Sequence, residues 1–68
     1  MNKTCDTCKY ERQMNTPLTE VYFDAKTSMG PWANMCQACF YRYGIKLGTG
    51  FGQKYERQPA GNWKKTAG

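Results

Sequence analysis

The chain has 68 residues, of which 40% are hydrophobic and 15% aromatic, and it carries a formal charge of +5 with no histidine. This length allows one domain and excludes a multidomain enzyme. In so small a domain, the burial of apolar surface only about balances the conformational entropy lost on folding. No apolar run is long enough for a membrane span or a signal-peptide core. We therefore expect an intracellular protein of the cytoplasm, with reduced cysteines and no membrane partner.

The charge is distributed unevenly along the sequence. Residues 1–39 hold four basic and four acidic side chains, whereas residues 40–68 hold six basic side chains and Glu56 as the single acid. The whole excess of +5 therefore lies in the C-terminal part, which suits contact with an anionic partner.

Four cysteines form two pairs with the same spacing, Cys5-x-x-Cys8 and Cys36-x-x-Cys39. Two intervening residues let both thiolates of a pair face one ion, and two pairs complete the tetrahedral sulfur shell that Zn²⁺ accepts. Four thiolates leave no position open for a substrate, so we expect one structural zinc ion. Such an ion contributes roughly 10 kcal/mol or more to the folding of a finger-sized domain. The alternatives are two disulfides in an exported protein, or an iron site of the rubredoxin type.

The first half of the chain predicts a short metal-binding turn, a loop and a strand. Residues 4–9 around the first pair are typical of a zinc knuckle, and residues 11–17 end in a polar stretch before proline that indicates a loop. Residues 18–25 alternate in part between apolar and polar side chains, which predicts a strand. On this strand we expect Val21, Phe23 and Ala25 to face inward, and Tyr22 and Asp24 to face outward.

A hairpin and a helix are expected next. Residues 28–31 contain Gly30 followed by proline, which predicts a turn, and residues 32–35 return as the second strand. We expect Trp32 in the core of this hairpin, beside the zinc site.

The helix is expected to begin after Asn34 as N-cap, because Gln37 stands three residues later in a variant of the capping box. Cys36 and Cys39 would then lie in its first turn. Either Gly44 or Gly48 ends it. At helical spacing, Phe40, Tyr43 and Leu47 share one face, and Arg42 and Lys46 share another.

The remaining sequence predicts a hinge and a tail. The glycine-rich run 48–52 lacks the Gly-Lys-Ser/Thr ending of a phosphate-binding loop, so it is interpreted as a hinge. This divides the chain into a zinc-binding domain over residues 1–52 and a basic, flexible tail over residues 53–68, of which the last ten residues are expected to be mobile.

The order of knuckle, hairpin and cysteine-bearing helix resembles a treble-clef zinc finger, and in particular the GATA-type fingers. Those fingers have a Thr-Pro-Leu stretch and a Leu-Cys-Asn-Ala-Cys sequence at the helix start; here the matching segments are 16–18 and 35–39, the latter reading Met-Cys-Gln-Ala-Cys. Residues 30–36 and 44–55 are also similar to small zinc-ribbon-type proteins of tailed bacteriophages. That second resemblance covers most of the chain and implies a small zinc-stabilised α+β fold of the treble-clef type and a phage origin, without an established function.

The sequence departs from the GATA pattern in three respects. The 27 residues between the cysteine pairs are more than that family has, Gln37 replaces its asparagine, and Phe40 replaces its glycine. Base reading in the family comes from the helix and the basic segment after it, where this chain offers only Arg42 and Lys46. Sequence-specific DNA recognition is therefore not expected.

Basic and aromatic residues alternate in the C-terminal half, and this pattern favours a nucleic-acid-binding module. Cationic side chains contact phosphates, and aromatic rings stack on exposed bases, each stack contributing about 1–3 kcal/mol. We expect binding of DNA or RNA with little sequence preference. The alternative is an adaptor that docks on a host or phage protein. The residues expected to contact nucleic acid are Arg42, Lys46, Lys54, Tyr55, Arg57, Trp63, Lys64 and Lys65.

An enzyme is not expected from this composition. Without histidine the chain lacks the histidine-dependent nuclease site of other treble-clef proteins and the Cys–His and Ser–His pairs of covalent catalysis. Its five acidic residues are scattered and form no pair suited to acid–base catalysis. We therefore expect no catalytic residues and no small-molecule substrate.

Overall fold

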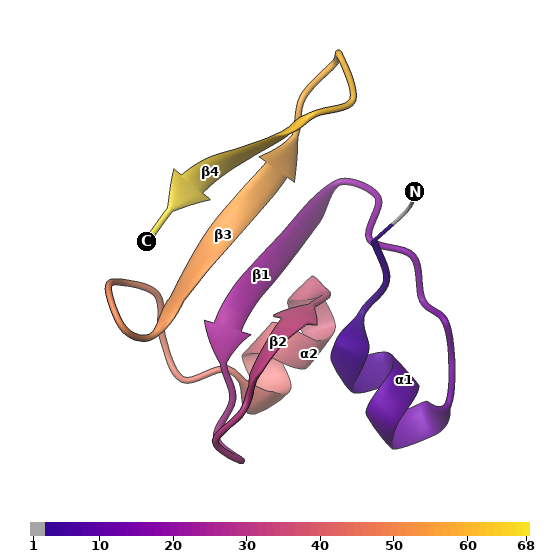
Figure 1. Ribbon diagram of the computed structural model, residues 1–68, viewed down its shortest axis with the longest axis vertical. Coiled ribbons are helices and arrows are strands. Elements are labelled where there is room, and N and C mark those ends of the chain that lie inside the picture. The colour runs from indigo at the N-terminus through magenta and orange to yellow at the C-terminus, as the bar shows by residue number, and fades with distance from the viewer. Residues whose placement is uncertain (1–2) are drawn as a thin grey trace.

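A four-stranded antiparallel sheet with strand order β2-β1-β3-β4 forms the centre of the structure, a computed structural model that describes residues 3–68 (Figure 1). Two short helices lie at the β1–β2 end of the sheet, while β3 and β4 extend away from them (Figure 1). The chain thus has a small α+β fold. Its elements are α1 (Asp6–Arg12), β1 (Val21–Lys26), β2 (Trp32–Met35), α2 (Gln37–Tyr43), β3 (Gly52–Arg57) and β4 (Trp63–Ala67).

The expected hairpin of β1 and β2 is confirmed. Phe23 pairs with Met35 and Lys26 with Trp32 in an antiparallel register. In the turn, the Thr27 hydroxyl donates a hydrogen bond of 2.8 Å to the carbonyl of Pro31, and Gly30 has a φ of 110°, a conformation that glycine adopts without steric cost. Trp32, however, is 48% exposed, so its predicted place in the hairpin core is wrong.

Strand β1 is buried on both faces, which corrects the prediction that Tyr22 points to solvent. Phe23 and Ala25 face a core with Met35 and α2, as expected. Tyr22 is 6% exposed because Tyr55 stacks on its ring, with ring centroids 5.0 Å apart. Trp63 covers the same ring edge-on from β4, which pairs with β3 to form the C-terminal hairpin. The sequence prediction missed this because the covering residues come from strands that it did not include.

Helix α2 begins later than predicted, at Gln37. Asn34 belongs to β2, and Cys36 is the N-cap residue, without a side-chain capping hydrogen bond. The helix ends at Gly44, whose N–H donates to the carbonyl of Phe40. A side chain at Gly44 would collide with the Phe40 ring, which explains why glycine ends the helix there. The expected apolar face is confirmed in that Phe40, Tyr43 and Leu47 all pack on the Phe23 core, although Leu47 lies beyond the helix.

Helix α1 replaces the predicted zinc knuckle. Cys5 is its N-cap residue, and its sulfur accepts a hydrogen bond from the backbone N–H of Cys8. Asp6 in the first turn and Arg12 in the last turn complement the helix dipole. Gln13 ends the helix in the left-handed conformation with a φ of 55°. The loop predicted over residues 11–17 therefore begins only at Gln13.

Strands β3 and β4 correct the expectation that residues 53–68 form a flexible tail. Strand β3 pairs with β1 through Tyr22 and Tyr55, and β4 pairs with β3, with a bulge after Lys54. The glycine run is a tight turn and not a hinge, because Gly48 and Gly52 exchange two backbone hydrogen bonds of 2.8 and 3.0 Å. Both strands of the C-terminal hairpin are therefore part of the sheet.

Candidate metal centre

The sulfur atoms of the four cysteines converge on one point. All four lie within 4.8 Å of one another, and the Cys8 sulfur is 3.6 Å from that of Cys39 and 4.0 Å from that of Cys36. Four sulfurs placed about 2.3 Å from a central zinc ion at tetrahedral corners are separated by roughly 3.8 Å. All four cysteines are free, so the disulfide alternative is not what the structure shows.

The two cysteine pairs take equivalent positions at the start of two seven-residue helices. Cys5 and Cys36 are the N-cap residues of α1 and α2, and Cys8 and Cys39 are the third helical residues. Residues three apart in a helical turn lie on the same side, so both thiols of a pair face inward together. The two helix starts meet because β2 ends immediately before Cys36 while α1 lies beside β2.

Hydrogen bonds tie the first pair to the rest of the site. The Cys5 sulfur accepts from the backbone N–H of Cys8 at 3.4 Å and of Cys36 at 3.3 Å. The Asp6 carboxylate accepts from the backbone N–H of Asn34 at 2.9 Å, which links α1 to the free edge of β2. These contacts fix the spacing of the two pairs even though 27 residues separate them.

The thiols of the site differ in acidity. Burial raises the pKa of Cys39 well above its usual range, and burial also raises the pKa of Cys5 in spite of its two backbone hydrogen bonds. The pKa of Cys8 is lowered, mainly because the Thr16 side chain donates a hydrogen bond to its sulfur. Buried thiolates this close together need a compensating positive charge, which a divalent cation supplies.

The residues therefore fit one metal ion held by four sulfur ligands. A closed shell of four cysteines leaves no open position, which is typical of structural zinc sites. Soft thiolate ligands in tetrahedral geometry suit Zn²⁺ and iron. The group is thus consistent with the expected zinc ion, held by Cys5, Cys8, Cys36 and Cys39.

The residues predicted to contact nucleic acid fall into two groups on opposite faces of the sheet. Directly paired residues share a face, and successive residues alternate. The pairings of Tyr22 with Tyr55, of Tyr55 with Lys65, and of Arg57 with Trp63 place one group on the Tyr22 face. That group is Tyr55, Arg57, Trp63 and Lys65, whereas Lys54 and Lys64 lie on the Phe23 face, where Arg42 and Lys46 belong to α2 and the segment after it.

The aromatic members are less free than the sequence indicates. Tyr55 stacks on Tyr22 with an interplanar angle of 11°, and Trp63 meets the same ring edge-on with centroids 4.8 Å apart. Both are half-buried, so part of each ring stays accessible. Lys46 likewise lies over the Phe51 ring, 4.2 Å from its centroid.

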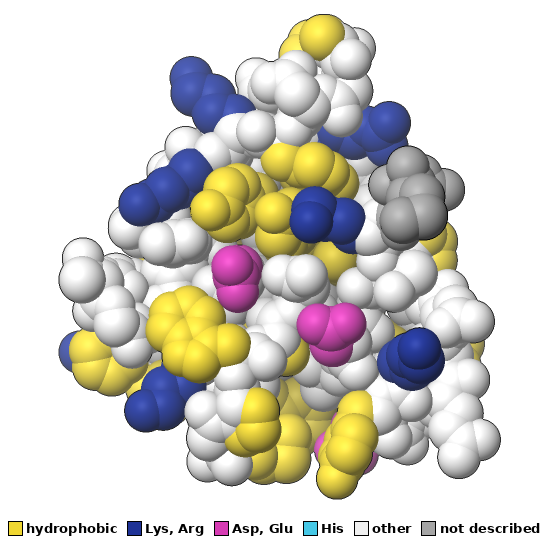
Figure 2. All heavy atoms as spheres, viewed as in Figure 1, with side chains coloured by type: hydrophobic (Ala, Val, Ile, Leu, Met, Phe, Trp, Pro, Cys, Tyr) yellow, Lys and Arg dark blue, Asp and Glu magenta, His cyan; other side chains and the backbone are white. Residues whose placement is uncertain are grey.

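One basic residue was missed by the sequence prediction. The Lys3 ammonium lies 5.2 Å from the centroid of the Tyr22 ring, beside the C-terminal hairpin. No sequence signal connects Lys3 with residues 53–68, because the contact depends on how the N-terminal segment crosses the sheet. Figure 2 shows the result as an apolar patch with basic side chains around it, over the β3–β4 part of the sheet.

Comparison with known proteins adds no further constraint. Within residues 3–68, no helix has the length and apolar character needed to cross a membrane. No protein-family model, no curated protein and no solved structure matches the chain.

Proposed function

We propose that this chain is a non-catalytic, zinc-stabilised module that binds nucleic acid through the Tyr22 face of its C-terminal hairpin, with little sequence preference. The observation that carries this proposal is the β3–β4 register, which brings Tyr55, Arg57, Trp63 and Lys65 to one face. We further propose a treble-clef relationship, since first pair, hairpin and second pair at a helix start follow in that order.

A sheet face that carries aromatic and basic side chains suits single-stranded nucleic acid better than duplex. Bases of a single strand are free to stack on accessible parts of aromatic rings, while cations follow the phosphates. Three basic side chains border the aromatic patch, namely Lys3, Arg57 and Lys65. If each neutralises one phosphate of a single strand, the logarithm of the affinity falls with the logarithm of salt concentration with a slope of about −2.

The test is fluorescence anisotropy of the zinc-loaded protein with labelled single-stranded DNA, duplex DNA and RNA at three salt concentrations. The double variant Arg57→Ala/Lys65→Ala removes two of the three basic side chains. The slope of log affinity against log salt concentration should therefore become shallower, at about −0.7. The matched control is Lys9→Ala/Arg12→Ala, which removes the same charges from α1 at the other end of the molecule. Absence of binding at low salt, or equal losses in both variants, would refute the proposed interface.

The second candidate function is the protein-binding adaptor, and one observation favours it. The structure has an apolar pocket beside α1, on the side of the molecule away from the C-terminal hairpin (Figure 1). If the chain acts only as an adaptor, the titrations with labelled nucleic acid should show no binding, and its protein partner should bind mainly through apolar anchors.

A further inference from the structure

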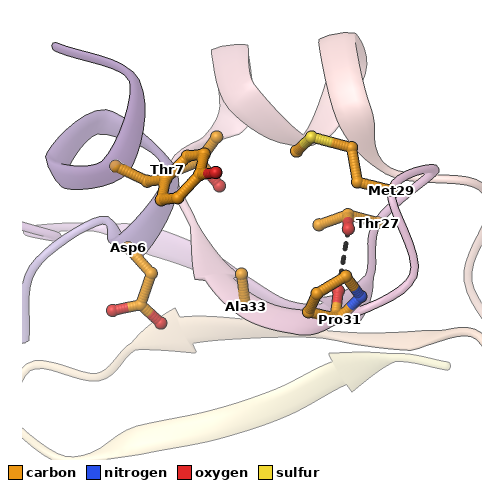
Figure 3. Close-up of a pocket in the computed structure, with 7 residues that line it drawn as sticks. Asp6, Thr7, Thr27, Met29, Pro31 and Ala33 are labelled. Carbon is orange, nitrogen blue, oxygen red and sulfur yellow. Dashed lines mark hydrogen bonds between the residues drawn. The ribbon is translucent and has the colours of Figure 1, made fainter.

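The pocket lies between α1 and the turn that joins β1 to β2. Its volume is about 400 Å³, which places it among the smaller ligand sites of proteins, with room for one large side chain. Figure 3 shows Thr7 on α1 facing Met29 of the turn across the opening, with Ala33 of β2 between them. The lining residues are Asp6, Thr7, Tyr10, Thr27, Met29, Pro31 and Ala33.

The rim of the pocket exposes large apolar side chains to solvent. Tyr10 is 80% exposed and Met29 is 54% exposed, and both lie on the pocket wall. A small apolar cavity with an exposed apolar rim suits the binding of an apolar side chain of a partner.

Charge defines the kind of partner. The lining residues include the carboxylate of Asp6 and no basic side chain. Asp6 and Thr7 are also the two residues between Cys5 and Cys8, so the pocket adjoins the metal centre. Residues 1–39 are formally neutral, but four thiolates contribute −4 and a bound Zn²⁺ contributes +2, which leaves this part of the zinc-loaded chain at −2.

We propose that this pocket binds a partner polypeptide by accepting one aromatic or long aliphatic side chain that is flanked by lysine or arginine. The apolar side chain fills the space between Met29 and Tyr10, and the flanking cation lies near Asp6 and the negatively charged metal centre. This site is separate from the proposed nucleic-acid interface, because α1 and the β3–β4 hairpin lie on different sides of the molecule (Figure 1). Both sites can therefore be occupied at once.

The test uses three short peptides as probes of the pocket, titrated into the zinc-loaded, isotope-labelled protein and followed by amide NMR shifts. Acetyl-Arg-Trp-Arg-amide should bind with a dissociation constant on the order of 1 mM, as one anchored side chain allows. Its shifts should centre on residues 27–33 and on α1. Acetyl-Arg-Ala-Arg-amide, which lacks the anchor, and acetyl-Glu-Trp-Glu-amide, which reverses the charge, should each bind at least about fivefold more weakly.

Two pairs of variants locate the site. Met29→Ala should weaken the tryptophan peptide about fivefold, whereas Met14→Ala, at an equally exposed methionine outside the pocket lining, should leave it unchanged. Asp6→Asn keeps an oxygen that can accept from the backbone N–H of Asn34 but removes the negative charge. The control Glu11→Gln removes a negative charge from the same helix at a residue outside the pocket lining. Only Asp6→Asn should reduce the preference for arginine over glutamate.

Several outcomes would overturn the proposal. These are shifts that do not saturate, shifts centred on β3 or β4, and equal effects in test and control variants. Shifts of residues 27–33 that appear on raising the protein concentration alone would assign the pocket to a second copy of this chain. Loss of peptide binding when single-stranded DNA is added would show that one surface serves both ligands. Each variant should first be shown to bind one equivalent of zinc, so that an unfolded variant is recognised as such.

Discussion

Replacing Trp63 by alanine tests whether the C-terminal hairpin is part of the folded core. Trp63 packs against the buried cluster of Cys5, Cys8, Leu18 and Tyr22, and its ring centroid lies 4.8 Å from that of Tyr22. Truncation of a fully buried tryptophan costs about 3–5 kcal/mol, and an aromatic pair contributes about 0.5–1.5 kcal/mol beyond the burial of its area. Because Trp63 is half-buried, Trp63→Ala should lower the free energy of unfolding by about 2 kcal/mol.

This loss is large for so small a protein, whose total stability is expected to be about 3–10 kcal/mol. The second tryptophan provides the control, since Trp32 is 48% exposed and, within residues 3–68, lies outside both this cluster and the second buried cluster, which consists of Phe23, Ala25 and Met35. Trp32→Ala should cost less than about 1 kcal/mol. The assay is urea unfolding at a fixed free zinc concentration, followed by far-ultraviolet circular dichroism so that the lost fluorophore does not affect the signal. Equal losses in the two variants would show that β4 does not contribute to the core.

Three further predictions concern the metal centre and the sheet. Removal of zinc with a strong chelator, or the substitution Cys39→Ser, should unfold the protein, because the metal contributes roughly 10 kcal/mol or more to folding. A cooperative unfolding transition of the metal-free protein in circular dichroism would contradict this. Burial raises the pKa of the Cys39 and Cys5 thiols, so metal binding displaces a proton from each of them, and the apparent zinc affinity should fall at least about a hundredfold for each unit by which the pH is lowered. Competition with a chelator at several pH values measures this, and a pH-independent affinity would be the contrary result. Gly52→Ala should lower the free energy of unfolding in urea by about 1–3 kcal/mol, because the new Cβ would lie 2.5 Å from the Cβ of Ala25 on the paired strand. Unchanged stability would show that β1 and β3 are not packed this closely at Gly52.

The local sequence was sufficient to predict the metal ligands and one hairpin. Two cysteine pairs of identical spacing indicate the ligand set without any knowledge of the fold. The β1–β2 hairpin follows from short-range signals, namely alternation in residues 18–25 and a glycine–proline turn at 30–31, because both depend on neighbouring residues. The apolar face of Phe40, Tyr43 and Leu47 was predicted for the same reason.

Helix α1 shows why local signals were insufficient at the first cysteine pair. Its N-cap is Cys5, which also belongs to the metal site, and its seven residues are too few to be stable in isolation. The helix is held by contacts that are distant in sequence, such as the hydrogen bond from the backbone N–H of Asn34 to the Asp6 carboxylate. The helix propensity of residues 5–12 does not depend on those contacts and therefore could not reveal the helix.

Local sequence is enough to predict the four cysteines that could hold a metal ion, the excess of positive charge in residues 40–68 and the β1–β2 hairpin. The folded arrangement was needed to show that β3 and β4 form a hairpin of the sheet, which of their side chains share a face, and that α1 and the β1–β2 turn line a pocket. Strand β3 is largely polar, and it is ordered by pairing with β1, whose Tyr22 is buried in turn by Tyr55 and Trp63. Such mutual burial between distant segments arises only when the chain has folded, and no local pattern records it.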